Sequence, residues 1–293
     1  MNRLKKSIFL ILSLTLGMMS AGCSSTINEQ QHTTETEGQR VVALSVSLVN
    51  ILAELDVELV GVPESQYELN DKMKDVAKVG LSMSPDVEVI AQLKPTHVIS
   101  LTTIESMIKP KLEQIGIEGT YLNLENIETL KASIKTLGEL FDRNEEAETL
   151  INDFEAEVNE TLESIKEKES PKVLILFGFP GNYLVATPSS FVGQMVELLG
   201  GINVVEDTSM AYAQANLEAL LVGKPDIILR MTHGVKEDVI EMFAKEFSEN
   251  PIWSQFEAVQ NGKVFDLDDS LFNVSASLET PTALKELAEI LYE

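Results

Sequence analysis

Two side chains that can bind a metal, Met83 and His233, stand in predicted loops rather than on the apolar face of a helix or strand. His233 follows the apolar stretch 227–231, so we expect it at the end of a buried strand. Met83 precedes Ser84 and Pro85, which are typical of the N-cap and the first position of a helix. Neutral imidazole and thioether are both metal ligands. The alternatives are a hydrogen-bonded structural histidine and a methionine folded back onto the helix cap.

Other reactive side chains are scarce. His32 lies in a polar segment, and His97 lies at the start of a predicted strand, where a structural role is expected. With 3 histidines and 1 cysteine in the chain, a zinc or manganese site built from several histidines is disfavoured. The sequence also contains no Gly-x-Ser-x-Gly elbow, no catalytic cysteine pattern and no phosphate-binding Gly-Lys-Ser/Thr motif. These features favour a binding protein over an enzyme.

An internal repeat sets the organisation of the chain. Segment 87–103 (VEVIAQLKPTHVISLTT) aligns without a gap on segment 217–233 (LEALLVGKPDIILRMTH). The polar and turn residues that are identical in the two copies are Glu88 and Glu218, Lys94 and Lys224, Pro95 and Pro225, and Thr102 and Thr232. Each copy predicts a short helix, a Lys-Pro turn and a buried strand. The repeat therefore indicates two similar lobes.

The stretch between the two copies, residues 144–168, predicts one long amphipathic helix without Gly or Pro. Its apolar residues recur every three or four positions: Ala147, Leu150, Ile151, Phe154, Val158, Leu162 and Ile165. A narrow apolar stripe on a helix of this length favours a bridge between two bodies. The alternative is an ordinary amphipathic helix packed on one domain. We expect an N-terminal lobe at 40–143 and a C-terminal lobe at 169–293.

Strands and helices alternate in both lobes. Residues 40–45 predict a strand and residues 46–57 a helix capped by Ser45 or Ser47. The backbone amides at the start of that helix, near Val46 and Ser47, would face a ligand at the carboxyl end of the strand. The sequence thus predicts an α/β fold with two Rossmann-like lobes joined by one long α-helix.

The N-terminus predicts export and a membrane anchor. Residues 7–19 are almost entirely apolar, too short to span a bilayer but suited to a secretory signal. The signal ends in Ser-Ala-Gly-Cys, which resembles a bacterial lipobox, although Ser20 stands where leucine is usual. The resemblance implies a signal peptide over 1–22, lipid on Cys23 and a polar tether over 23–39. The alternative is an ordinary signal with an incidental cysteine.

Acidic residues dominate the composition, with 47 Asp and Glu against 22 Lys and Arg and a net charge of −25. Such a surface argues against nucleic acid as a partner, because both would be negatively charged. It also argues against adsorption to anionic lipids, so a lipid on Cys23 would have to hold the protein at the membrane.

Four motifs carry a family resemblance that spans the whole exported domain. They are KVGLSMSPD around Met83, PGNYLVAT around Tyr183, KPDIILRMTHG around His233, and SASL at 275–278. The sequence resembles bacterial solute-binding proteins in which two α/β lobes are joined by one long helix. These proteins serve importers of haem, corrinoids and ferric siderophores. Within this group it is most similar to the haem-receptor lipoproteins of the Gram-positive iron-regulated surface determinant system.

The resemblance implies that haem is bound between the lobes as cargo. In that family, a loop methionine and a loop histidine coordinate the haem iron from opposite faces, and these roles carry over to Met83 and His233. Imidazole with thioether is a known axial pair of low-spin haem iron. The amides near Val46 and Ser47 are candidates for the propionates, and Tyr183 for stacking or for donating its hydroxyl. A ferric siderophore or a corrinoid stays open as an alternative cargo.

The resemblance also implies partners at the membrane. In the wider group, one glutamate on each lobe meets arginines on the membrane subunits of an ABC importer, and the matching positions are Glu88 and Glu218. The alternative is that both glutamates merely cap or solvate their helices. A haem-donating surface protein is an expected second partner, and the expected location is the extracellular face of the cell membrane.

Overall fold

The computed structural model describes residues 38–65, 69, 71–73 and 75–292. The expected signal peptide, the lipidated Cys23 and all but the last two residues of the expected tether lie outside this part of the chain. Among the described residues, no helix is both long enough and apolar enough to cross a membrane.

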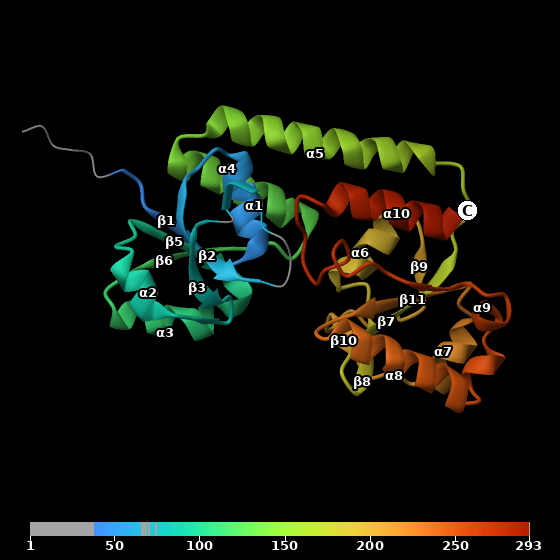
Figure 1. The fold of residues 1–293 in the computed structure, drawn as a ribbon. Coiled ribbons are helices and arrows are strands. Elements are labelled where there is room, and N and C mark those ends of the chain that lie inside the picture. The colour runs from blue at the N-terminus through green and yellow to red at the C-terminus, as the bar shows by residue number, and fades with distance from the viewer. Residues whose placement is uncertain (1–37, 66–68, 70, 74, 293) are drawn as a thin grey trace, which may run out of the picture. The chain divides into compact units, whose positions relative to one another are not determined.

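The N-terminal lobe is built on a six-stranded sheet with the order β4-β3-β2-β1-β5-β6 (Figure 1). Its strands are β1 (Val41–Ala43), β2 (Leu59–Glu64), β3 (Ala77–Leu81), β4 (Ser84–Pro85), β5 (His97–Leu101) and β6 (Gly119–Leu122). All neighbours pair in parallel except β3 and β4. The helices of this lobe are α1 (Val46–Glu54), α2 (Val87–Gln92), α3 (Glu105–Gln114) and α4 (Ile127–Phe141), with 3-10 turns at Asp71–Met73 and Thr102–Ile104.

The C-terminal lobe has a mixed sheet with the order β10-β8-β7-β11-β12, and β9 pairs with β7. Its strands are β7 (Lys172–Phe179), β8 (Asn182–Ala186), β9 (Ile202–Asn203), β10 (Tyr212–Ala213), β11 (Ile227–Thr232) and β12 (Val264–Asp266). Its helices are α6 (Phe191–Leu198), α7 (Leu217–Gly223), α8 (Lys236–Glu249), α9 (Glu257–Gln260) and α10 (Thr280–Tyr292), with a 3-10 turn at Trp253–Gln255. Strands β7, β11 and β12 are parallel, whereas β8 is antiparallel to both β7 and β10.

The long helix α5 (Asn144–Ser164) joins the two lobes (Figure 1). It is four residues shorter than the stretch that the apolar spacing predicts, because residues 165–167 form a turn. Its buried side chains include Phe154 and Val158, and it packs against α4 of the N-terminal lobe and α10 of the C-terminal lobe. The helix therefore serves both lobes, and the alternative of a helix packed on a single domain does not hold.

The repeat is visible in three dimensions. Helices α2 and α7 are capped by side chains at matching positions, Asp86 and Asn216. Each helix is followed by a lysine with left-handed backbone, Lys94 or Lys224. The strand that comes next, β5 or β11, pairs in parallel with its neighbours. Two short copies of one sequence motif thus build the same helix, turn and strand in each lobe.

One local prediction was wrong. The cap of α2 is Asp86, whose carboxylate accepts hydrogen bonds from the amides of Glu88 (3.0 Å) and Val89 (3.1 Å). Ser84 and Pro85 instead form β4, which pairs antiparallel with the end of β3. Gly80 lies in this tight reversal with a φ of +83°, which glycine adopts easily and residues with a Cβ rarely adopt.

Candidate cargo site

Met83 lies in the turn between β3 and β4 and is 62% exposed. Its neighbour Leu81 is 58% exposed. A methionine folded back onto the helix cap would be covered, so this alternative does not describe the structure. Two large apolar side chains open to water at one hairpin end favour a binding surface, because such exposure is otherwise unfavourable.

His233 directly follows β11 and is exposed. Its backbone N–H donates to the carbonyl of Gly178 (2.9 Å), which fixes the loop against β7. Within the described part of the chain, its ring nitrogens have no hydrogen-bond partner. His97 differs: its Nδ1 lies 2.9 Å from the hydroxyl of Thr96, and its ring meets Phe141 edge-on. His97 is therefore structural, whereas the imidazole of His233 is free to bind.

An aromatic cluster stands beside His233. Its ring centroid lies 5.3 Å from that of Phe177, which stacks on Tyr212 at 4.3 Å and also contacts Phe179 at 6.5 Å. Burial raises the pKa of Tyr212 to about 12, so its ring is neutral at physiological pH. The cluster places the partly exposed rings of Phe179 and Tyr212 and the buried ring of Phe177 next to a free imidazole, which suits a planar apolar ligand.

No sequence motif marks this cluster. Phe177 and Phe179 lie two residues apart in β7, so they share one face of the strand, and the sequence spacing alone indicates this. The contact of Tyr212 with Phe177 was not predictable from sequence, because β10 is only two residues long and is connected to β7 through β8.

Tyr183 is directed toward α8. Tyr183 lies opposite Gly178 in the antiparallel pair of β8 and β7. A Cβ added at Gly178 would meet Phe243 and Val239 of α8, so this face of the sheet is covered by α8. The Tyr183 hydroxyl donates to Glu246 Oε1 (3.1 Å), and burial raises its pKa. Phe177 precedes Gly178 on β7, and successive side chains of a strand point to opposite faces of the sheet. Tyr183 therefore lies on the other face from the one on which His233 meets the aromatic cluster. In this structure, the hydroxyl of Tyr183 already has a partner.

The start of α1 has the geometry expected of an anion-binding helix end. Ser45 is the N-cap, and its hydroxyl accepts a hydrogen bond from the amide of Leu48 (3.3 Å). The amides of Val46 and Ser47 have no partner among the described residues. Free amides at a helix N-terminus can receive a carboxylate.

Glu88 and Glu218 are both exposed and occupy the second position of α2 and α7. The capping hydrogen bonds of these helices come from Asp86 and Asn216 instead. Neither glutamate is therefore needed as the cap.

Arg230 is not available as a free cation for a propionate. Its guanidinium makes two hydrogen bonds to the carboxylate of Asp266, at 2.7 and 2.6 Å, and lies over the rings of Phe243 and Phe247. A paired, stacked arginine of this kind holds β11, β12 and α8 together.

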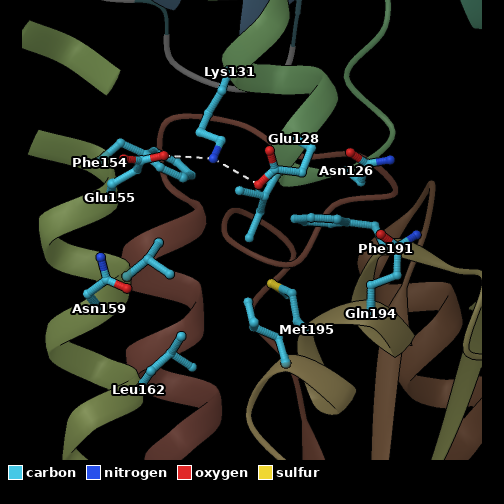
Figure 2. Close-up of a pocket in the computed structure, with 13 residues that line it drawn as sticks. Asn126, Glu128, Lys131, Phe154, Glu155, Asn159, Leu162, Phe191, Gln194 and Met195 are labelled. Atoms are coloured by element: carbon cyan, nitrogen blue, oxygen red, sulfur yellow. Dashed lines mark hydrogen bonds and ion pairs between the residues drawn. The ribbon is translucent and has the colours of Figure 1, made fainter. Parts of the chain in front are cut away.

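A separate pocket of about 580 Å³ lies where α4, α5 and α6 meet (Figure 2). Figure 2 shows Lys131 between Glu128 and Glu155, at distances of 2.8 and 2.7 Å. Apolar side chains such as Phe154 line other parts of the wall. None of the lining residues is one of the predicted cargo residues, so this pocket belongs to the junction around the bridging helix.

Comparison with known families agrees with the two-lobed architecture. The model of the periplasmic binding protein family matches residues 41–271, which include most of both lobes and the bridging helix. The chain therefore belongs to the periplasmic binding protein family.

Within that family, the chain is 37% identical to the high-affinity heme uptake system protein IsdE of Staphylococcus aureus, over 100% of this chain and 99% of the relative. The crystal structure of S. aureus IsdE complexed with heme is 38% identical, with a TM-score of 0.81 over 87% of this chain and 99% of that one. An ABC transporter substrate-binding protein from Listeria monocytogenes EGD-e is 41% identical, also with a TM-score of 0.81, over 87% of this chain and 98% of that one.

Proposed function

We propose that this protein is a haem receptor that delivers its cargo to an ABC importer for iron acquisition. The observation that carries the proposal is the free imidazole of His233 beside the cluster of Phe177 and Tyr212. The similarity to a heme-complexed IsdE structure supports the same cargo.

In this proposal, His233 and Met83 are the two axial ligands of the haem iron. Both ligands are neutral, and thioether favours ferrous iron more than a second imidazole would. Two occupied axial positions leave no site for peroxide or oxygen, so the protein carries haem without catalysis. Peroxide turnover by the loaded protein well above that of free haem would contradict this.

The free amides of Val46 and Ser47 are the proposed partners of a haem propionate. Tyr183 keeps a proposed role at the cargo, but its hydroxyl would first have to leave Glu246. A hemin titration of Tyr183→Phe tests this role: weaker binding supports a hydroxyl contact with haem, and unchanged binding removes it.

The ligand assignment is tested by hemin titration of the exported domain and of His233→Ala and Met83→Ala, followed by absorption. We expect loss of the low-spin spectrum in both. The matched controls are His97→Ala, which removes a structural histidine, and Met107→Ala, which removes another exposed methionine. An unchanged spectrum in either ligand variant would remove that ligand.

The remaining parts of the proposal concern the membrane. A lipid on Cys23 anchors the protein at the extracellular face, and Glu88 and Glu218 dock it on the importer's membrane subunits. A haem-donating surface protein supplies the cargo. Labelling with a radioactive fatty acid tests the anchor: label that disappears in Cys23→Ala supports it, and absence of label in the parent protein would contradict it.

A further inference from the structure

The helix that carries Glu218 also carries an unusual apolar residue. Val222 lies one turn after Glu218 in α7, so the two side chains are neighbours on the helix surface. Val222 is 80% exposed, the highest value among the exposed large apolar residues of the described chain. An apolar side chain this open is expected to gain by being covered.

Val222 also stands at the edge of a hollow of about 700 Å³. One side of the hollow is formed by α7, including Ala219 and Leu220, and the other by β9 and the segment after it. Ile202 of β9 is 50% exposed there. The two sides meet closely, since a Cβ at Gly223 would lie 3.1 Å from Val204 Cβ. The hollow is therefore a formed concavity, lined by apolar side chains such as Val204 and Leu220 together with polar ones such as Asn203 and Gln214.

Charge surrounds this hollow. Glu206 and Asp207 line it, and Glu218 stands beside it on α7. Lys172 is the basic residue among those that line it. Apolar side chains next to a mainly acidic set of charged residues fit a partner segment that presents an apolar side chain flanked by basic residues.

The N-terminal lobe carries a different residue at the position that matches Val222. In the repeat, Glu88 corresponds to Glu218, and Gln92 corresponds to Val222. Gln92 is also exposed and stands one turn after Glu88 in α2. The two lobes therefore share the glutamate but differ in the residue beside it.

We propose that the importer-docking surface of the C-terminal lobe extends from Glu218 across Val222 into this hollow, where it receives an apolar side chain of the importer's membrane subunit. This rests on the proposed docking function and adds that the two lobes dock unequally: the N-terminal lobe by charge, the C-terminal lobe by charge and apolar burial. The partner side chain is expected to be flanked by arginine or lysine.

The test compares binding of the haem-loaded protein to the importer, reconstituted in lipid nanodiscs, for the parent and four variants. Val222→Gln gives the C-terminal lobe the residue of the N-terminal lobe, and glutamine is a good helix former, so α7 is retained. We expect roughly tenfold weaker binding, the size of a typical buried apolar anchor, and a similar loss for Ile202→Gln. The control is Ile240→Gln, at a 41% exposed position on α8. All variants must keep the parent haem spectrum.

Glu218→Ala separates the two proposals. If Glu218→Ala weakens binding while Val222→Gln and Ile202→Gln do not, the docking function stands and the apolar extension is overturned. If none of the three weakens binding, both fail. Equal weakening by Ile240→Gln would also overturn the extension, because the loss would then be general to apolar surface residues.

Discussion

Lys94 and Lys224 occupy the same place in the two lobes and share the same unusual backbone, with φ angles of 46° and 49°. Each follows the helix that carries a proposed docking glutamate and precedes the proline that leads into a buried strand. Left-handed backbone in a residue other than glycine costs roughly 1–2 kcal/mol. The presence of the same strained turn in both lobes indicates that it sets the angle between helix and strand.

Substitution at Lys224 should therefore depend on backbone preference rather than on charge. Lys224→Gly should leave the free energy of unfolding within about 1 kcal/mol of the parent, because relief of strain offsets the added chain entropy. Lys224→Val should be at least about 1 kcal/mol less stable than Lys224→Gly, since a β-branched residue fits left-handed backbone poorly. Urea unfolding measures both. Equal stability of the two variants would contradict the role of the turn.

The docking glutamates should be separable from cargo binding. Glu88→Ala with Glu218→Ala should abolish haem-dependent growth and leave the hemin titration unchanged, because both side chains are exposed and neither caps its helix. The matched control is Glu145→Ala with Glu257→Ala, two first-turn glutamates on α5 and α9. Loss of haem binding in the first pair would mean that these glutamates serve the lobes themselves.

Glu246 should contribute to stability in a pH-dependent way. Burial alone would raise its pKa, but hydrogen bonds from Asn250, Trp253 and Tyr183 outweigh this and lower the pKa below its ordinary value of 4.5. A lowered folded-state pKa gives stability that is present above about pH 4.5 and is lost as the pH falls through the folded-state pKa.

The variants Glu246→Ala and Glu246→Gln test this. The alanine leaves the Nε1 donor of the fully buried Trp253 without its acceptor, which should cost about 1–3 kcal/mol. The glutamine keeps an acceptor and should cost less, with a shallower loss of stability below pH 4.5 than the parent shows. Urea unfolding across acid pH is the measurement. A parallel pH dependence in parent and glutamine variant would show that Glu246 does not titrate as argued.

Tyr212 should act at the alkaline end. Burial raises its pKa from 10.0 to about 12, so the folded state holds this proton more tightly than the unfolded state does. Its contribution is fully present below pH 10 and is lost as the pH rises through about 12. The free energy of unfolding of Tyr212→Phe should therefore fall less steeply than that of the parent over this window. An unchanged slope would mean that the phenol is open to water.

The sequence predicts some features of the fold and of the site but not others. The repeat and the apolar stripe predicted the lobes and the bridging helix, because periodicity follows directly from burial. The strand end at His233 was predictable for the same reason. The cap of α2 at Asp86 was not predictable. The adjacent Ser84 and Pro85 fit the pattern of a helix start equally well, and only their pairing with β3 excludes them from the helix. The contact of Tyr183 with Glu246 depends on residues far apart in the chain, which no local pattern records.

The most direct test of the central claim is a hemin titration of the exported domain, read by absorption in the oxidised and reduced states. We expect saturable one-to-one binding with a low-spin spectrum that changes in both Met83→Ala and His233→Ala. Absence of saturable binding would contradict the assignment of haem as the cargo. A ferric siderophore or a corrinoid would then be the expected cargo of the same two-lobed fold.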